Sequence, residues 1–488
     1  MQVVAVSSER QATDTMSFIS FSFLFLFLFT FLVRLTVGRQ KTEKAYLLLL
    51  LIISLIFYGS YIPWYLTLLL FTTLVDYYAG QHIYENPSSR SKKLFLVLSL
   101  TANLGLLAFF KYTNFFMDTT ILVARLFGAP FRPLPHLDLI LPIGISFFTF
   151  QSMSYTIDIY RGLIKPERTY WRFLLFVCFF THLISGPIVR ARELIYQFDR
   201  KRRIHLKVLL EGLYLIISGL FFKMVVADNI GDYINTYWKF GSADNMAAVV
   251  PFLLTLLFSC QIFSDFLGYS RIAMGTAYLL GFKLPLNFNN PYIASSFREF
   301  WTRWHITLST WIRDYLYIPL GGNKGSELKT YATLMITMIL AGLWHGAALT
   351  FVFWGAIHGL ALLFERILRK NGLLNTRSIL GQIFGFFVVQ ATILVSWVFF
   401  RSDTLAQAFR FLNNLFFNGG WNPSYGSLFL SALWFVLPVF FLHLRGLFIE
   451  KKWLSVPGPI EKGILAALML YGIFTLYGKT NAFLYFKF

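Results

Sequence analysis

The sequence predicts an all-α protein that crosses a membrane many times. Of its 488 residues, 57% are hydrophobic and only 14% are charged, whereas soluble proteins carry about 25% charged residues. Apolar runs of about 18 residues recur along the chain, and a helix needs this length to cross a hydrocarbon core of roughly 30 Å. The basic residues cluster in the short connections between these runs. Length, apolarity and charge placement therefore all indicate a polytopic helical membrane protein.

The first apolar run covers residues 17–37 and is followed by Arg39 and Lys41. It is too long and too evenly apolar for a cleaved signal peptide, so we expect a retained signal-anchor helix. Residues 1–15 form a polar extension, and we expect the natural start to be Met16 rather than Met1. No linker or soluble segment interrupts the rest, which predicts a single membrane domain over residues 16–488.

Further apolar runs follow the first, and some are short or interrupted by Gly and Pro. Such runs fit re-entrant or interfacial helices, which a membrane protein tolerates where they are buried or line a cavity. We therefore predict about 11 to 13 transmembrane helices, with re-entrant or interfacial helices in addition. The runs are 47–58, 62–77, 94–110, 139–159, 173–188, 208–226, 247–266, 271–282, 332–349, 351–368, 379–400, 428–444 and 464–477.

The formal net charge of +20 has two interpretations. It could indicate nucleic-acid binding, but the sequence leaves no basic face with interleaved aromatic residues free for that purpose. Positive-inside topology and contact with anionic lipid headgroups explain it better. The connection 190–207 is the most basic and is placed in the cytoplasm, together with the stretch 283–329.

Catalytic motifs of the common soluble enzymes are absent from the sequence. It has no GxSxG, Walker A or HExxH pattern, and no metal site is expected. Cys178 and Cys260 lie inside apolar runs and are interpreted as small buried hydrophobic residues.

The stretch 297–316 has apolar residues at helical spacing, interleaved with charges. Ser295 or Ser296 can cap this helix, and Pro319 with Gly321–Gly322 ends it. An interfacial helix anchored by Trp and Arg explains most of the pattern. It does not explain His305, which falls beside two tryptophans on the apolar side.

His345 lies deep in the apolar run 332–349, among small residues that include Gly342 and Gly346. The small residues permit close helix approach or leave room for a substrate. One interpretation of His345 is a histidine hydrogen-bonded across helices for structure. The other is a functional group, because an ionisable residue at membrane depth is costly to bury. The unperturbed pKa of a histidine side chain is about 6.5. Its neutral form can take the proton from a hydroxyl that attacks a thioester. For His358, a structural role is predicted.

Asp76, Asp158 and Asp265 also occur within or at the ends of apolar runs. Buried carboxylates of this kind can mark a proton pathway. They keep open a transporter or flippase as a different class of function.

Six segments in this order resemble the membrane-bound O-acyltransferase family, and within it the bacterial alginate O-acetyltransferase (AlgI) branch. The resemblance extends over essentially the whole chain. The segments are LPIGISFFTFQSMSYTIDIYRG (141–162), SGPIVR (185–190), FSDFLGYSRIAMGTAYLLGFKLPLNFNNPY (263–292), FREFWTRWHITLSTWIRDYLYIPLGG (297–322), LAGLWHGAALTFVFWGAIHG (340–359) and SWVFFRS (396–402).

The resemblance implies a ring of tilted helices around a central tunnel that holds the active histidine. The family's catalytic histidine falls on His345, and its second marked polar position falls on His305. Trp304, Trp344 and Asp265 are expected to line the tunnel.

Three basic residues of the stretch 283–329, namely Arg303, Arg313 and Lys324, are expected to hold the phosphates of the acyl donor. The alternative for each is an anchor that faces lipid. No tightly bound cofactor is implied, and acetyl-CoA is the expected donor substrate.

The implied function is membrane O-acetylation in the bacterial inner membrane. Acetyl would pass from the cytoplasmic donor to an extracytoplasmic acetyltransferase partner, for a surface polysaccharide such as alginate or another exopolysaccharide. An alternative within the family is D-alanyl transfer to teichoic acid. The sequence leaves the acceptor open, with cellulose and peptidoglycan also compatible.

Overall fold

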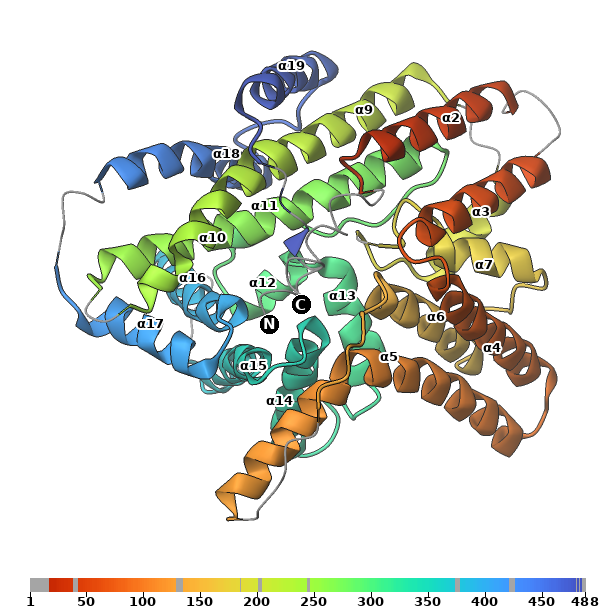
Figure 1. Ribbon diagram of the computed structural model, residues 1–488, viewed down its shortest axis with the longest axis horizontal. Helices are drawn as coiled ribbons and strands as arrows, with labels where there is room; N and C mark the ends of the chain where they lie inside the picture. Colours follow the sequence, from red (N-terminus) through yellow and green to blue (C-terminus); the bar gives the residue numbers. More distant parts are fainter. Residues whose placement is uncertain are drawn as a thin grey trace. The chain divides into compact units, whose positions relative to one another are not determined.

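Helices make up the regular structure of the computed structural model, and no strand occurs among the residues it describes (Figure 1). These residues are 17–37, 43–128, 135–184, 186–200, 204–243, 246–373, 378–420, 426–479, 481 and 483–484. The predicted polar extension 1–15 and the predicted start at Met16 lie outside them. The chain forms two compact units, which are Met1–Gly212 with Ala273–Pro285, and Leu213–Ile272 with Leu286–Phe488.

The first unit contains the N-terminal helices. A buried carboxylate joins three of them, because Asp76 of α4 accepts hydrogen bonds from Ser99 (2.5 Å) and Asn103 (2.9 Å) of α5 and from Ser152 of α6. Asp76 therefore has a structural explanation as a polar contact between membrane helices. The helices are α2 (Phe21–Val37), α3 (Glu43–Gly59), α4 (Tyr65–Glu85), α5 (Ser89–Leu126), α6 (Ile145–Tyr160), α7 (Tyr170–Cys178), α8 (Ala191–Leu194) and the 3-10 helix η1 (Ile195–Asp199).

Two helices cross from one unit into the other. They are α9 (Leu206–Leu220), which continues through the π-helix η2 (Phe221–Ala227) into α10 (Asp228–Gly241), and α11 (Val249–Leu279). The second unit also contains η3 (Pro291–Ile293), α12 (Phe297–Arg303), α13 (Ile306–Ile312), the π-helix η4 (Arg313–Tyr317), α14 (Glu327–His345), α15 (Leu349–Lys370), α16 (Ile379–Arg401), α17 (Leu405–Phe417), α18 (Gly426–Glu450) and α19 (Pro459–Leu476).

The protein is a multi-pass membrane protein, as the sequence predicts. Within the described part of the chain, seven helices are long and apolar enough to span a membrane, and two shorter apolar helices, Phe21–Thr36 and Lys44–Gly59, accompany them. The seven are Ser89–Leu126, Leu206–Gly241, Val249–Leu279, Leu349–Lys370, Ile379–Arg401, Ala432–Glu450 and Pro459–Leu476.

Three predicted spans are wrong in their extent. The sequence predicts separate runs at 247–266 and 271–282, but these residues contribute to the single 31-residue helix α11. Its polar residues Asp265 and Ser270 are buried and bonded inside the protein, so they do not interrupt it. The run 173–188 forms only the nine-residue helix α7, followed by turns, and nine residues rise about 14 Å, too little to cross a bilayer.

Candidate active site

The predicted helix 297–316 is broken in the middle, at His305. Its start is as predicted, because the Ser296 hydroxyl accepts a hydrogen bond from the Glu299 N–H (3.2 Å). However, α12 ends before Trp304, and His305 adopts the left-handed backbone conformation (φ 40°, ψ 53°) before α13 begins. A non-glycine residue in this region is uncommon and such residues gather at functional sites. The break therefore supports a functional role for His305.

Asn287 holds the His305 ring in a defined orientation. The Asn287 side-chain oxygen lies 3.1 Å from His305 Nδ1 and accepts a hydrogen bond from the Thr307 hydroxyl (2.7 Å). An amide oxygen only accepts hydrogen bonds, so His305 Nδ1 carries the proton and Nε2 is the acceptor. Burial lowers the pKa of His305, which keeps the ring neutral. His305 is thus held as a neutral imidazole with one basic nitrogen.

His345 is the last residue of α14 and is 4% exposed. Three aromatic rings surround it, with centroid distances of 5.0 Å to Trp344, 5.0 Å to Trp354 and 5.3 Å to Phe400. The Trp344 ring also lies 6.1 Å from the His305 ring. The rings of His305 and His345 thus both lie beside the indole of Trp344, although the two histidines are 40 positions apart in the sequence.

Small residues near His345 serve close packing of α14 against α15, which lie side by side (Figure 1). A Cβ on Gly342 would lie 2.2 Å from the Phe351 carbonyl oxygen, and one on Gly355 would lie 2.3 Å from the Met338 carbonyl oxygen. Of the two explanations that the sequence offered for these residues, close helix approach is the one observed.

A cavity of about 150 Å³ opens beside His345. Its wall is mostly apolar and includes the rings of Trp301 and Trp354, with Ser309, Thr337 and Arg313 as polar members. The indole N–H groups of Trp301 and Trp354 are buried and have no hydrogen-bond partner among the described residues. The residues that line the cavity therefore bring together an imidazole, a guanidinium and two indole rings whose buried N–H groups have no partner among the described residues.

The remaining predicted site residues lie in different settings. Arg303 is held by two carboxylates, Glu299 (2.8 Å) and Glu450 (2.6 Å). Arg313 is half exposed, pairs with Asp314 (2.7 Å) and lines the His345 cavity. Lys324 is exposed in the turn after η4. Of the three predicted donor-binding residues, Arg313 is thus the one that contributes to this cavity.

The residues predicted to line a tunnel lie outside the lining of the His345 cavity. Trp304 is buried against Trp397 (ring centroids 5.2 Å apart), and Trp344 lies between the two histidines. Asp265 forms an ion pair with Lys223 (2.8 Å). Asp265 is thus paired within the protein, outside the lining of the His345 cavity.

Two important residues were missed by the sequence reasoning. Asn287 gave only a weak signal, as one of three asparagines in LNFNNPY, and nothing local shows that it meets His305. Lys223 gave a clear signal, since a lysine inside the apolar run 208–226 needs a buried partner.

His358, predicted to be structural, hydrogen-bonds Ser396 (3.0 Å) and packs against Trp354.

The chain is similar to a known family of membrane enzymes. A model of the membrane-bound O-acyltransferase family matches residues 169–400. This range contains His305, His345 and every residue of the cavity described above.

Individual relatives extend the similarity beyond that range. The chain is 39% identical over 378 residues to the "Probable alginate O-acetylase AlgI" of Azotobacter vinelandii, covering 77% of this chain and 74% of the relative. It is 35% identical over 392 residues to the peptidoglycan O-acetyltransferase of Helicobacter pylori, covering 75% and 73%. A teichoic acid D-alanyltransferase of Bacillus subtilis is 32% identical over 248 residues, covering 48% of this chain and 60% of the relative.

Proposed function

The chain belongs to the membrane-bound O-acyltransferase family and is an acyltransferase of its O-acetyltransferase group; from this premise we propose that it takes acetyl from cytoplasmic acetyl-CoA for O-acetylation of a cell-surface polysaccharide. The similarity to alginate and peptidoglycan O-acetylating enzymes supports a polysaccharide as the final acceptor. Alginate or another exopolysaccharide is the preferred acceptor, reached through an extracytoplasmic acetyltransferase partner. The location that this requires is the bacterial inner membrane.

The observation that carries this proposal is the small cavity beside His345. Its volume of about 150 Å³ is well below the roughly 300–1,000 Å³ of sites for drug-sized ligands. A two-carbon acyl group and its thioester fit such a space, whereas a long acyl chain does not. The mostly apolar wall offers few polar groups to hold water beside the thioester, which limits its hydrolysis.

The proposed chemistry is acyl transfer by general-base catalysis. His345 accepts the proton of the acceptor hydroxyl while that oxygen attacks the thioester carbonyl carbon. The carbon–sulfur bond then breaks, and the imidazolium returns its proton to the departing thiolate. The products are the acetyl ester and free coenzyme A, so the reaction balances without a further reactant.

Two other features of the site support this chemistry. The unsatisfied indole N–H groups of Trp301 and Trp354 are suitable donors for the oxyanion that forms on the carbonyl oxygen. His305 does not line the cavity; its neutral ring is held by Asn287 and packs against Trp344, so it would help to position His345 through that indole.

Arg313 is the best-placed residue for the phosphates of the donor, with the exposed Lys324 as a second contact. Arg313 lines the cavity and remains 59% exposed in its side chain, so its guanidinium can meet both the cavity and water. Guanidinium groups bind phosphate oxygens in a bidentate manner. This arrangement supports entry of the donor from the side that carries the basic stretch 283–329.

D-alanyl transfer is less well supported. An alanyl group carries an ammonium, which a binding site would need to pair with a carboxylate or several acceptors. Among the residues that the structure describes, no Asp or Glu lines the cavity. An uncharged acetyl group is the better match.

The test is purified protein in lipid nanodiscs, supplied with radiolabelled acetyl-CoA and a soluble alcohol or oligosaccharide acceptor. We expect His345→Ala to lower transfer and thiol release by about 10²–10⁴-fold, the usual contribution of a general base. His443→Ala is the matched control, because His443 is also buried but does not line the cavity. The proposal is wrong if folded His345→Ala protein transfers acetyl at the rate of the unchanged protein.

A further inference from the structure

A second and larger cavity, of about 550 Å³, lies in the same unit as the active site. Four helices that are apolar enough to span a membrane contribute to its wall, namely α9 with η2, α11, α18 and α19. Its volume falls in the range of about 300–1,000 Å³ that accommodates an organic ligand. We refer to it as the lateral pocket.

Basic side chains gather in the lateral pocket. Arg271 of α11, Arg445 of α18 and Lys462 of α19 all line it, and none of the described residues in its lining is Asp or Glu. Glu461, which is outside the lining, pairs with Arg445 (2.5 Å). Arg271, Arg445 and Lys462 thus give the described lining of the pocket an excess of positive charge.

Arg271 is the residue of the three that most needs an anionic partner. Its guanidinium lies over the Phe222 ring at 5.2 Å, but it has no hydrogen bond or ion pair with any residue that the structure describes. An ionisable group inside a membrane-spanning helix is costly without a partner and marks a functional site by default. Arginine in particular matches phosphate oxygens in geometry and charge.

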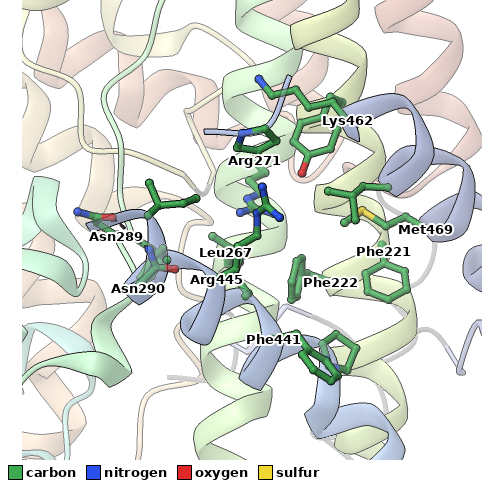
Figure 2. A pocket seen from close by; sticks show the side chains of 18 of the residues that line it. Phe221, Phe222, Leu267, Arg271, Asn289, Asn290, Phe441, Arg445, Lys462 and Met469 are labelled. Atoms are coloured by element: carbon green, nitrogen blue, oxygen red, sulfur yellow. Dashed lines mark hydrogen bonds between the residues drawn. The ribbon is translucent and has the colours of Figure 1, made fainter. Parts of the chain in front are cut away.

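The rest of the pocket is apolar and aromatic. Figure 2 shows Arg271 and Lys462 toward one end of the pocket and Phe441 at the other, with Phe222 between them. Phe221 and Met469 extend the apolar wall, and Asn289 and Asn290 add polar groups at its side. The pocket is therefore amphipathic, with a cationic end and an apolar end.

The three basic residues of the pocket lie near helix ends that meet at the same side of the pocket. Arg271 and Arg445 lie toward the ends of α11 and α18, whereas Lys462 lies near the start of α19. The connection from α18 to α19 carries Lys451 and Lys452. Basic residues at connections favour the cytoplasmic side, and basic pockets between membrane helices on that side bind anionic lipid headgroups.

We infer that the lateral pocket binds one anionic phospholipid, whose phosphate contacts Arg271 and Lys462 and whose acyl chain lies along Phe222 and Phe441. A soluble donor would need no apolar wall built from four spanning helices, whereas a lipid needs both ends of this pocket. The lipid is a bound component of the protein, separate from the acetyl-transfer site beside His345.

The experiment measures lipid retention by native mass spectrometry after delipidation in detergent. Phosphatidylglycerol or phosphatidylcholine is added back to the unchanged protein and to its variants. We expect one phosphatidylglycerol to bind in preference to phosphatidylcholine. We expect Arg271→Gln to weaken that binding about five- to tenfold, since a basic residue contributes about 1 kcal/mol to the binding of an anionic headgroup.

Two variants serve as controls. Arg271→Lys keeps the charge and should retain most of the binding, which also shows that a change at this position folds. Lys451→Gln removes an exposed charge from the same connection without touching the pocket lining, and it should leave binding unchanged.

Three results would overturn the inference. One is equal retention of the two lipids by the unchanged protein. Another is equal weakening by Arg271→Gln and Lys451→Gln, which would indicate only surface charge. The third is displacement of the lipid by coenzyme A together with a raised KM for acetyl-CoA in Arg271→Gln, which would assign the pocket to the donor. Loss of acetyl transfer without a change in lipid binding would bear on the proposed function alone.

Discussion

At the scale of single residues, the unsatisfied indole groups of the cavity require an explanation. The buried N–H of Trp301 and that of Trp354 have no hydrogen-bond acceptor among the described residues. Such a donor costs about 1–3 kcal/mol, and Trp238 and Trp397 carry buried indole N–H groups of the same kind elsewhere. Both rings line the His345 cavity. The loss of stability is explained if these N–H groups bind an oxygen of the substrate that gains negative charge during the reaction.

Trp354→Phe tests this role, because it removes the N–H while leaving an aromatic ring against His345. We expect kcat to fall about 10²–10³-fold with little change in the KM for acetyl-CoA, as for loss of one oxyanion donor. The matched control is Trp397→Phe. Trp397 also has a buried, unsatisfied N–H, but it does not line the cavity. A kcat that falls equally in both variants would argue for packing and against oxyanion stabilisation.

At the scale of elements, the sequence predicts what depends on near neighbours and misses what depends on distant ones. The helical membrane fold follows from the apolar runs, and the Ser296 cap follows from residues three positions apart. The break at His305 does not, because the Ile306 N–H donates to the Asn287 carbonyl oxygen (2.9 Å) and the His305 ring meets the Asn287 side chain. Local periodicity contains no information about that contact. For the same reason, the sequence does not predict that Asp265 pairs with Lys223, which is 42 positions away.

The contact of α14 with α15 gives a prediction at this scale. Gly355→Ala places a Cβ 2.3 Å from the Met338 carbonyl oxygen, which is too close for a contact, so the helices must separate. We expect a loss of about 1–3 kcal/mol of stability, as for overpacking, and reduced acetyl transfer because His345 ends α14. Thermal unfolding in detergent and the nanodisc assay measure the two effects.

Gly463→Ala in α19 is the control for the helix-packing prediction. A Cβ at Gly463 would meet no atom within 4 Å, so this change should be neutral or stabilise the helix by up to about 1 kcal/mol. Equal unfolding temperatures for the two alanine variants would contradict the tight contact between α14 and α15.

At the scale of the whole molecule, a buried ion cluster joins distant parts of the second unit. The Lys223 ammonium contacts Asp228 (2.7 Å), Asp265 (2.8 Å) and the Asn481 carbonyl oxygen (2.8 Å). The second oxygen of Asp265 accepts a hydrogen bond from the Leu484 N–H (2.7 Å). Two membrane helices and the chain near residue 481 thus meet at one charged group. This cluster is separate from the His345 cavity, so its stability and the chemistry can be tested separately.

Lys223→Met leaves two carboxylates buried without their cation. This lowers the stability more than removal of all three charged groups does. We expect a loss of about 3–5 kcal/mol, seen as a lower unfolding temperature. We expect the triple variant Lys223→Met, Asp228→Asn, Asp265→Asn to recover most of that loss, because it removes the unpaired charges while conserving shape. Both the single and the triple variant should still transfer acetyl at low temperatures at which they remain folded. If the single variant unfolds no earlier than the triple variant, the charges of this cluster do not hold the second unit together and its contribution is only that of packing.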